Sequence, residues 1–258
     1  MVNMIIDGKH VSAEENITIM EAAERNGIPI PKLCYLKGIN EIAACRVCVV
    51  ELEGKEKLIT SCNNLVKEGM VIHTNSPKVR NHRRNTVQLL LSQHDNRCVV
   101  CPRNGNCGLQ QVAYDLNILE IPFKQEPEYQ PWDKNFPLIR NSAKCIKCMR
   151  CVSVCEKVQT LNIWDMVGTG AHTTVGVSGG RTIQQADCAL CGQCITHCPV
   201  NALRSRDDTK AIFGLGGALN DPNKIVVVQV APAVRAAWGE IFDLPPEIAT
   251  EKRLVPAL

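Results

Sequence analysis

Short runs of alternating apolar and polar residues dominate the first 75 positions of the chain. Residues 4–13, MIIDGKHVSA, carry apolar side chains on both sides of Asp7-Gly8, a dipeptide that favours a two-residue hairpin turn. Three further stretches alternate with the same period of two: CVVELEG at 48–54, KLITSC at 57–62 and MVIHTN at 70–75. The pattern predicts a small curved sheet that begins with a hairpin.

Two stretches show the helical period instead. The segment TIMEAAERNG begins with the capping-box pair Thr18 and Glu21 and ends at Gly27, which predicts one helix. A longer helix is predicted to start at Ser76-Pro77, and its apolar face consists of Val79, Val87, Leu90 and Leu91. We expect three of its arginines to lie in solvent or, as the alternative, to form a docking patch for a partner: Arg80, Arg83 and Arg84.

The second half of the chain contains an internal repeat. The segments CIKCMRCVSVC and CALCGQCITHC, which start at Cys145 and Cys188, share one cysteine spacing. A short helix at 108–118 and a proline-rich extended linker at 121–137 precede the repeat, and the stretch between its halves has strand–turn–strand character. Beyond residue 210 the pattern predicts a buried strand at 224–230, a helix at 231–242 and a loose end at 244–258.

The composition adds one unusual number, which is 15 cysteines in 258 residues. An odd count cannot pair completely into disulfides, and the N-terminus has neither the basic nor the apolar region of a secretory signal. A net charge of +3 and 4% aromatic residues argue against nucleic acid as a partner, and no run is long enough to span a membrane. We therefore expect a cytoplasmic, reduced protein whose cysteines bind metal.

The repeat has the cysteine spacing of bacterial two-cluster ferredoxins. There the first three cysteines of each run bind one [4Fe–4S] cluster and the fourth binds the other, because a tight loop reaches only three corners of a cube. Paired zinc ribbons lack two consecutive x2 gaps followed by x3. One predicted ligand set is Cys145, Cys148, Cys151 and Cys198. The other is Cys155, Cys188, Cys191 and Cys194.

The cysteines of the first 62 residues do not have the spacing of plant-type ferredoxins. A pair with two residues between them lies in a loop before a strand, with one cysteine upstream and one on a later strand. Four thiolates on a frame of strands and loops suit a [2Fe–2S] cluster, and structural zinc is the alternative. The predicted ligands are Cys34, Cys45, Cys48 and Cys62.

Three cysteines remain, Cys98, Cys101 and Cys107. Clusters and structural zinc normally take four ligands, so the fourth is either His94 or a cysteine from elsewhere. Since the other twelve cysteines are assigned, we predict that His94 completes a third [4Fe–4S] site, and its neutral imidazole should raise the reduction potential there. The other histidines have no such spacing, and we interpret them as bystanders: His10, His73, His82, His172 and His197.

The order of these sites resembles the N-terminal region of iron-only ([FeFe]) hydrogenases and the large subunit of respiratory NADH dehydrogenase. The resemblance covers residues 1 to about 210, and residues 222–238 also resemble the start of the hydrogenase catalytic domain. It implies an α+β fold in four parts. These are a β-grasp [2Fe–2S] ferredoxin domain at 1–77, a small helical His/Cys3 [4Fe–4S] domain at 78–120, a bacterial-type two-[4Fe–4S] ferredoxin domain at 121–210 and a C-terminal docking tail at 211–258.

Those hydrogenases bind their hydrogen-activating cluster through cysteines further downstream, and this chain has none after Cys198. The resemblance therefore implies the electron-transfer clusters without the hydrogen-activating cluster. It fits the iron–sulphur subunit of electron-bifurcating transhydrogenases of the Stn type. It implies an electron-transfer subunit of an oxidoreductase with one [2Fe–2S] and three [4Fe–4S] clusters and no catalytic residues. Flavins and NAD(P) would be bound by partners: an NAD(H)-oxidising FMN flavoprotein, a small thioredoxin-like [2Fe–2S] subunit or domain, and an NADP(H) flavoprotein, with ferredoxin as a further partner.

Three alternatives remain open. The chain is the electron-input portion of a truncated or split NAD-dependent bifurcating [FeFe]-hydrogenase, or a diffusible polyferredoxin-like carrier, although such carriers are usually short and acidic. The third is a colourless zinc-binding scaffold. The chain's glycine-rich stretches, GTGAHTTVG and GLGG, lack the βαβ setting of a dinucleotide-binding fingerprint, so nicotinamide chemistry is expected on partners.

Overall fold

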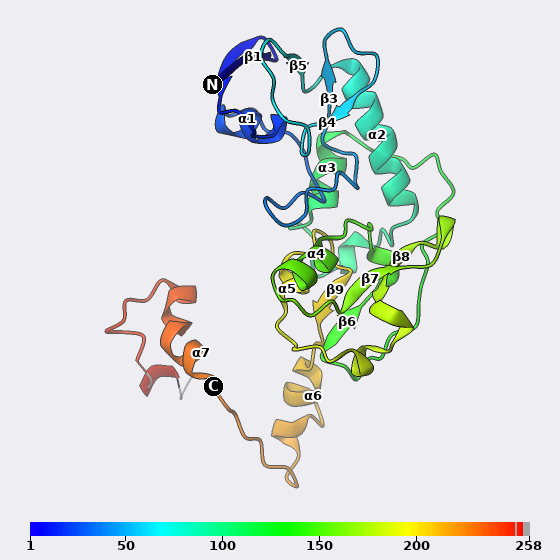
Figure 1. Cartoon of the computed structure of the whole chain (residues 1–258). Coiled ribbons are helices and arrows are strands. Elements are labelled where there is room, and N and C mark those ends of the chain that lie inside the picture. The colour runs from blue at the N-terminus through cyan, green and yellow to red at the C-terminus, as the bar shows by residue number, and fades with distance from the viewer. Residues whose placement is uncertain (251, 255–258) are drawn as a thin grey trace. The chain divides into compact units, whose positions relative to one another are not determined.

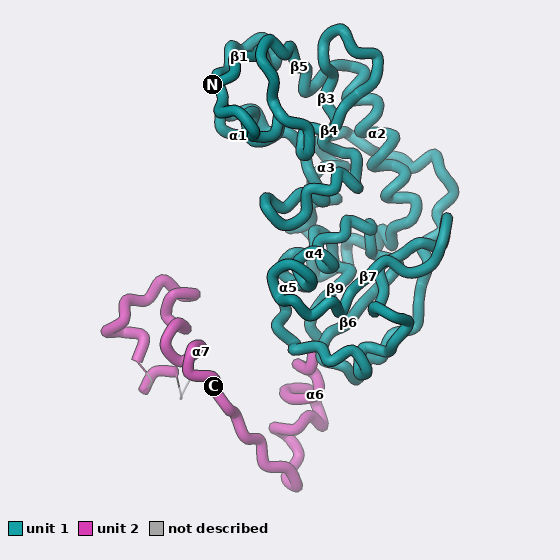
Figure 2. Tube along the Cα trace, in the orientation of Figure 1, with its two compact units in different colours: residues 1–206 teal, residues 207–258 magenta. Residues whose placement is uncertain are grey.

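The computed structural model describes residues 1–250 and 252–254. The chain divides into two compact units, residues 1–206 and residues 207–258 (Figure 2). The first unit has a mixed composition of helices and short strands, in agreement with the predicted α+β class (Figure 1). No helix among the described residues combines the length and the apolar character that crossing a membrane requires.

The first unit begins with a five-stranded mixed sheet of strand order β2-β1-β5-β3-β4 (Figure 1). Its strands are β1 (Val2–Ile6), β2 (Lys9–Ala13), β3 (Val49–Leu52), β4 (Ile59–Thr60) and β5 (Val71–His73). The predicted hairpin is confirmed, because β1 and β2 pair antiparallel. Asp7 and Gly8 have φ angles of 49° and 81°, the left-handed values that a type I′ turn requires at both positions.

Helix α1 (Ile19–Arg25) packs its apolar face on this sheet. The predicted capping box is confirmed, since the Glu21 amide donates to Thr18 Oγ1 at 3.2 Å and the Thr18 amide donates to Glu21 Oε2 at 3.1 Å. Ile19 and Met20 are fully buried together with Ile6 of β1. The capped helix thus closes the first hydrophobic core of the unit.

Helix α2 (Pro77–Ser92) follows the sheet and lies beside α3 (Gly108–Asp115). Both were predicted, and Val79 and Val87 of α2 are fully buried as expected. The expectation that Arg83 lies in solvent is wrong, because only 4% of its surface is exposed. Arg83 is one helical turn from each of these valines, so it lies on the inward stripe of the helix. Arg80 and Arg84 are exposed as predicted.

The last part of the first unit contains two small two-stranded sheets and two short helices. Its elements are β6 (Leu138–Arg140), α4 (Arg150–Lys157), β7 (Trp164–Val167), β8 (Thr174–Val177), α5 (Gln193–Thr196) and β9 (Leu203–Ser205). Strand β6 pairs with β9, and β7 pairs with β8, which confirms the strand–turn–strand prediction. The 121–137 linker has no helix or strand, as predicted. Short 3-10 helices include η1 (Cys98–Val100), η2 (Ser142–Lys144), η3 (Gly170–His172), η4 (Ser178–Gly180) and η5 (Ile183–Ala186).

A second hydrophobic cluster runs through the whole of the first unit. It combines Leu33 and Val47 of the N-terminal part with Leu109 of α3, Leu138 of β6 and Trp164 of β7. Several cysteines lie inside this cluster. The segments that carry the predicted ligands therefore share one core.

The second unit, described by itself, contains α6 (Thr209–Phe213), the 3-10 helix η6 (Ala218–Asn220), α7 (Pro232–Ala237) and the 3-10 helix η7 (Trp238–Phe242). Helix α7 with η7 confirms the helix predicted at 231–242. The buried strand predicted at 224–230 is wrong: these residues form no strand, and Ile225 and Val227 are 93% and 83% exposed. No strand among the described residues pairs with them. Of the predicted loose end, residues 251 and 255–258 lie outside the described part of the chain.

Candidate metal centres

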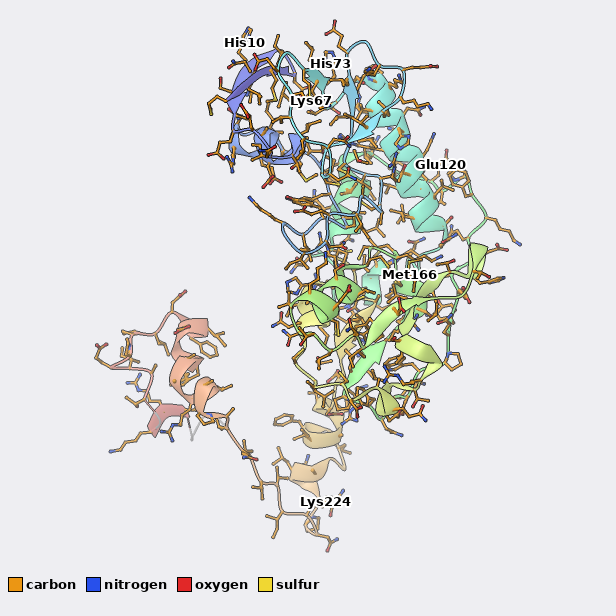
Figure 3. The ribbon with its side chains drawn as sticks, in the orientation of Figure 1. His10, Lys67, His73, Glu120, Met166 and Lys224 are labelled. Atoms are coloured by element: carbon orange, nitrogen blue, oxygen red, sulfur yellow. The ribbon has the colours of Figure 1, made fainter. Side chains whose placement is uncertain are left out.

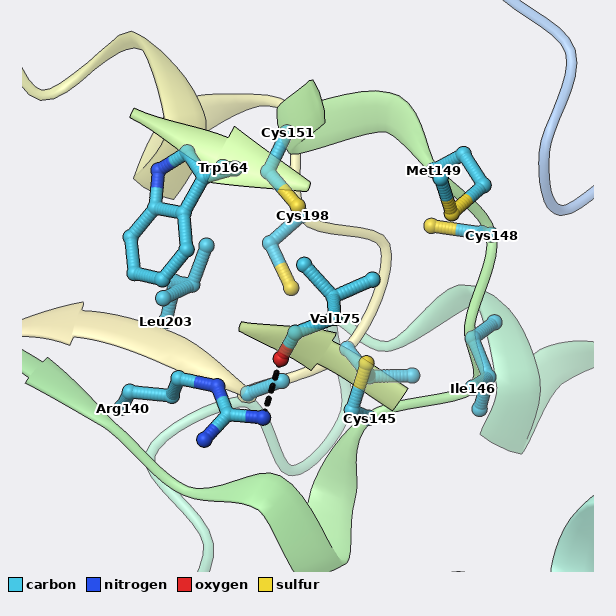
Figure 4. Close-up of a pocket in the computed structure, with 12 residues that line it drawn as sticks. Arg140, Cys145, Ile146, Cys148, Met149, Cys151, Trp164, Val175, Cys198 and Leu203 are labelled. Atoms are coloured by element: carbon cyan, nitrogen blue, oxygen red, sulfur yellow. Dashed lines mark hydrogen bonds between the residues drawn. The ribbon is translucent and has the colours of Figure 1, made fainter. Parts of the chain in front are cut away.

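Two cavities in the last part of the first unit are each lined by four cysteines. The first cavity is lined by Cys145, Cys148, Cys151 and Cys198 (Figure 4). The second cavity is lined by Cys155, Cys188, Cys191 and Cys194. The structure thus brings together each of the two sets that the repeat predicts. In a cluster every thiolate binds a different iron, so the ligands surround a space instead of converging on one point.

The repeat in sequence is also a repeat in backbone conformation. Lys147 and Met149, in the loop that begins at Cys145, have φ angles of 55° and 64°. Leu190 and Gly192, at the matching places after Cys188, have φ angles of 54° and 74°. Left-handed conformations are costly for residues other than glycine and persist where the surroundings impose them. Here they make each loop wrap around its cavity.

The short helices carry the fourth cysteine of each run to the other cavity. Helix α4 begins one residue before Cys151 and ends beyond Cys155, so it leads from the first cavity to the second. Cys198 follows α5 and lines the first cavity. Trp164 of β7 lines both cavities, so the two share one wall. This is the crossed arrangement that the spacing predicts.

The two cavities differ in burial and in charge. Three of the four cysteines of the first cavity are buried, whereas Cys191 of the second cavity is exposed. Burial raises the pKa of Cys148 and of Cys194 to about 12, because a thiolate is poorly solvated there. Such thiols need a nearby positive charge to become ligands, and bound iron supplies one. The fit with an iron–sulphur cluster is therefore good at both cavities.

The four N-terminal cysteines also lie together. The Cys34 thiol donates a hydrogen bond to Cys45, which lowers the pKa of Cys45 to about 6 and raises that of Cys34. The Cys62 thiol donates to Cys48 in the same way, and the pKa of Cys48 falls to about 7. One thiol of each pair is thus the more acidic of the two, and the thiolate is the form that binds iron.

Helix α2 holds in place the loop that carries Cys45 and Cys48. The Arg83 guanidinium donates to the Val47 carbonyl at 2.9 Å and to the Val49 carbonyl at 2.8 Å. Cys48 accepts at its own carbonyl from the Ser61 hydroxyl at 2.8 Å. These bonds hold the loop on both sides of Cys48.

The third predicted site has three thiols near one another and one buried histidine. Burial raises the pKa of Cys98, and the charges of Cys107 and Cys101 raise it further. His94 is 7% exposed, and its Nδ1 has no hydrogen-bond partner. Burial lowers the pKa of His94 to about 4, so the imidazole is neutral at neutral pH, the form that binds metals. An unpartnered ring nitrogen in a buried site fits a metal ligand.

Three hydrogen bonds, two of them between backbone groups, join this third site to the first cavity. The Asp95 amide donates to the Ala143 carbonyl at 2.7 Å, and Lys144 Nζ donates to the Asp95 carbonyl at 2.9 Å. At the other end, the Gly108 amide donates to the Pro199 carbonyl at 3.1 Å. The neighbours of His94 and Cys107 therefore bond to the neighbours of Cys145 and Cys198.

Asn40 joins the N-terminal site to the first cavity. Its side chain is fully buried, and its Nδ2 donates to the Cys34 carbonyl at 2.8 Å and to the Cys148 carbonyl at 3.0 Å. Its Oδ1 accepts from the Ser153 hydroxyl of α4 at 2.8 Å. Arg150 adds bonds to the carbonyls of Cys34 and Tyr35. One buried amide thus connects cysteines of two different sites.

Sequence reasoning missed Asn40, Arg83, Arg140 and Lys144. The one available signal was that Arg83 shares the helical stripe of Val79 and Val87. The predicted bystanders His10 and His73 are on strands β2 and β5 of the N-terminal sheet (Figure 3). Among the described residues, no group of three or more His, Cys, Asp or Glu side chains is arranged to hold a single metal ion.

Three segments of the chain match known protein families. Residues 1–77 match the 2Fe-2S iron-sulfur cluster binding domain, and residues 83–122 match the NADH-ubiquinone oxidoreductase-G iron-sulfur binding region. Residues 144–202 match the 4Fe-4S dicluster domain. The presence of one 2Fe-2S region and of 4Fe-4S regions is therefore confirmed.

Several curated proteins are similar over most of the chain. The NADP-reducing hydrogenase subunit HndD of Solidesulfovibrio fructosivorans is 40% identical over 264 residues, which is 100% of this chain and 45% of that protein. Iron hydrogenase 1 of Clostridium pasteurianum is 34% identical over 95% of this chain and 42% of its own length. The NADPH-Fe(3+) oxidoreductase subunit alpha of Geobacter sulfurreducens is 35% identical over 80% of this chain and 24% of its own length.

The chain spans less than half the length of these relatives. A solved structure of an NAD+-reducing [NiFe]-hydrogenase in the H2-reduced state has the same fold over 80% of this chain and 87% of its own, with a TM-score of 0.73 and 24% identity. The motifs, the sequence relatives and the fold agree with one another. The chain is therefore similar over most of its length to parts of two hydrogenase proteins and of an NADPH-Fe(3+) oxidoreductase subunit, and it contains a 2Fe-2S region and 4Fe-4S regions.

Proposed function

We propose that this chain is the iron–sulphur electron-relay subunit of a flavin-based, electron-bifurcating NADH/NADPH/ferredoxin transhydrogenase complex. It would hold one [2Fe–2S] and three [4Fe–4S] clusters in the four ligand sets described above, with His94 as the one nitrogen ligand. We propose the domain boundaries 1–77, 78–120, 121–210 and 211–258, the last being a docking tail. When bound, each cluster accepts and releases one electron, and no bond of a substrate is made or broken on this chain.

One observation carries the proposal, which is that the other three predicted sites are each connected to the first cavity. It shares Trp164 with the second cavity, and Cys148 is bonded to the N-terminal site through Asn40. The third site adjoins it through the contacts of Asp95 and Gly108. Sites that exchange electrons must be close and rigidly held, and a shared hydrophobic core provides both.

The residues of the chain would serve this relay in two ways. Buried apolar side chains such as Ile146, Val175 and Val200 line the first cavity and exclude water from it. Backbone amides donate to sulphur, as the Lys147 amide does to Cys145 Sγ and the Ile163 amide to Cys155 Sγ, both at 3.4 Å. Hydrogen bonds to sulphur and exclusion of solvent are two of the factors that set cluster potentials.

The names of two relatives support a place for this chain in a complex of several subunits. HndD is named as a subunit of an NADP-reducing hydrogenase, and the Geobacter protein as a subunit of an NADPH-Fe(3+) oxidoreductase. We expect an NAD(H)-oxidising FMN flavoprotein, a small thioredoxin-like [2Fe–2S] subunit or domain, an NADP(H) flavoprotein and ferredoxin as partners, and a cytoplasmic location.

Anaerobic purification of the full chain from its native host tests the proposal. We expect flavoprotein subunits to co-purify and the chain to carry about 14 iron with acid-labile sulphide. A stable monomer without flavoprotein would contradict the relay role. Zinc in place of iron and sulphide would instead favour a structural scaffold.

A second candidate is the electron-input portion of a truncated or split NAD-dependent bifurcating [FeFe]-hydrogenase. The observation that favours it is the match with HndD, which extends over 100% of this chain and so includes the second unit. Hydrogen evolution from reduced viologen by the purified complex discriminates between the two. Robust hydrogen evolution would favour the hydrogenase, whereas NADPH-dependent reduction of NAD+ and ferredoxin without hydrogen would favour the transhydrogenase.

A further inference from the structure

Three cationic side chains are buried among the described residues, and each one faces a different predicted metal centre. Arg83 is 4% exposed, Arg140 is 8% exposed and Lys144 is 8% exposed. Arg83 interacts electrostatically with Cys48, Lys144 with Cys98, and Arg140 with Cys145 and Cys151. The second cavity has no charged residue in its lining.

Arg140 is the cation that lies in a cavity wall itself. It is in β6 opposite Leu203 of β9, and both residues line the first cavity. Figure 4 shows its guanidinium pointing toward Val175 and Cys145. The guanidinium donates to the Val175 carbonyl, to Gln130 Oε1 at 3.1 Å and to Thr174 Oγ1 at 3.4 Å.

All of these hydrogen-bond partners are neutral. No Asp or Glu of the described residues forms an ion pair with Arg140, and the Glu128 carboxylate acts on it less strongly than Cys145 and Cys151 do. Buried Lys144, in contrast, has the Asp95 carboxylate at 3.5 Å. An unpaired buried cation is costly unless an anion lies nearby. A cluster bound by four thiolates is such an anion, because its net charge is negative and becomes more negative on reduction.

We propose that the Arg140 guanidinium is the fixed countercharge of the first cavity and raises the reduction potential of the cluster held there. The physical reason is that a positive charge stabilises the reduced, more negative state more than the oxidised one, and its effect is strong where water is excluded. Because the second cavity lacks such a charge, Arg140 contributes to a difference in potential between the two sites. The inference rests on the proposed function in one respect, that the first cavity holds a cluster.

The test is a redox titration of the full chain, followed by EPR, with iron analysis of each sample. In Arg140→Gln, the reduction potential of one [4Fe–4S] cluster should fall. At a fixed potential, the ratio of reduced to oxidised cluster should decrease at least tenfold, which corresponds to a shift of about 59 mV. The other steps should stay in place. Arg140→Lys keeps the charge and should hold the step near its wild-type position.

Arg204→Gln is the matched control. Arg204 pairs with Ile139 in the same two strands, so its side chain lies on the face opposite to Arg140 and Leu203. Removing this charge should move no step. An Arg140→Gln protein with full iron and unmoved steps, or with all steps moved together, would overturn the inference and leave the relay proposal intact.

Loss of the cluster is a separate outcome. If Arg140→Gln lacks about four iron, Arg140→Lys must still bind them, since the charge is what the site requires. If Arg140→Lys also lacks this iron, the site requires the hydrogen-bonding geometry of the guanidinium and not its charge. That result would overturn the electrostatic role. A wild-type chain without any iron and sulphide would instead contradict the proposed function.

Discussion

Two histidines among the described residues have a buried ring nitrogen without a hydrogen-bond partner, and only one of them is a predicted ligand. These atoms are Nδ1 of His94 and Nε2 of His82. An unsatisfied buried polar atom costs free energy, so each needs an explanation. For His94 we propose that the nitrogen is the fourth ligand of the third predicted site, four residues before Cys98 in the sequence.

The first prediction therefore concerns His94→Ala. This variant should lose or convert the third [4Fe–4S] cluster while the other three remain, because no other ligand replaces the imidazole. Iron analysis and EPR measure the change. His82→Ala is the control and should keep all four clusters. Unchanged iron and EPR in His94→Ala would show that the sixteen-ligand assignment is wrong.

At the residue scale, cysteine spacing was more informative than any other signal. The ligand sets could be proposed from sequence because a cube constrains the distance between neighbouring cysteines along a chain. The buried cations could not be predicted in this way. Arg140 and Lys144 are recognised only when strands and loops distant in sequence come together, as Arg140 does with Val175.

At the scale of elements, the loop at 34–40 and helix α4 are joined by hydrogen bonds of side chains. Besides Asn40, Lys157 Nζ donates to the Ile39 carbonyl at 2.7 Å. Loops with few backbone bonds of their own depend on such contacts, since a buried carbonyl needs a donor. The contact between the N-terminal site and the first cavity therefore depends on a small number of donors.

Replacement of Asn40 by alanine should be strongly destabilising. The change leaves buried carbonyls of Cys34 and Cys148 without this donor, at a cost of about 3 kcal/mol in the free energy of unfolding. The midpoint of thermal unfolding should fall by roughly 6–12 °C, measured anaerobically on iron-loaded protein. Asn81→Ala, on the exposed side of α2, should change it little. A midpoint of Asn40→Ala equal to that of the wild type would contradict this role.

Helices and hairpins of the first unit were predictable because their signals are local. The turn at Asp7-Gly8 and the cap at Thr18 each involve residues close in sequence. The strand predicted at 224–230 was wrong because strand formation does not depend on local signals alone. Its apolar run has the composition of a buried strand, but a strand also needs a neighbour to pair with, which the run itself does not encode.

At the scale of the whole molecule, all sixteen proposed ligands lie in the first unit, which ends at Arg206. Limited proteolysis of the iron-loaded chain should therefore cut first near residues 207–231, where the chain is largely exposed. The larger fragment should keep about 14 iron and the visible spectrum. Mass spectrometry and iron analysis of the fragment measure this. Loss of a cluster with the second unit would show that the second unit contributes to a site.

Because Cys191 is exposed, we expect oxygen to oxidise the second cavity before the first. Cys191 is an exposed residue, whereas the cysteines around the first cavity are mostly buried. Oxidation of cysteine follows exposure and thiolate character, so bleaching in air should have two phases, and the fast phase should release about four iron. Cys191 should be the first cysteine found as a sulphinic or sulphonic acid. Such a chain would keep its fold and part of its colour, yet it would no longer relay electrons through the second cavity.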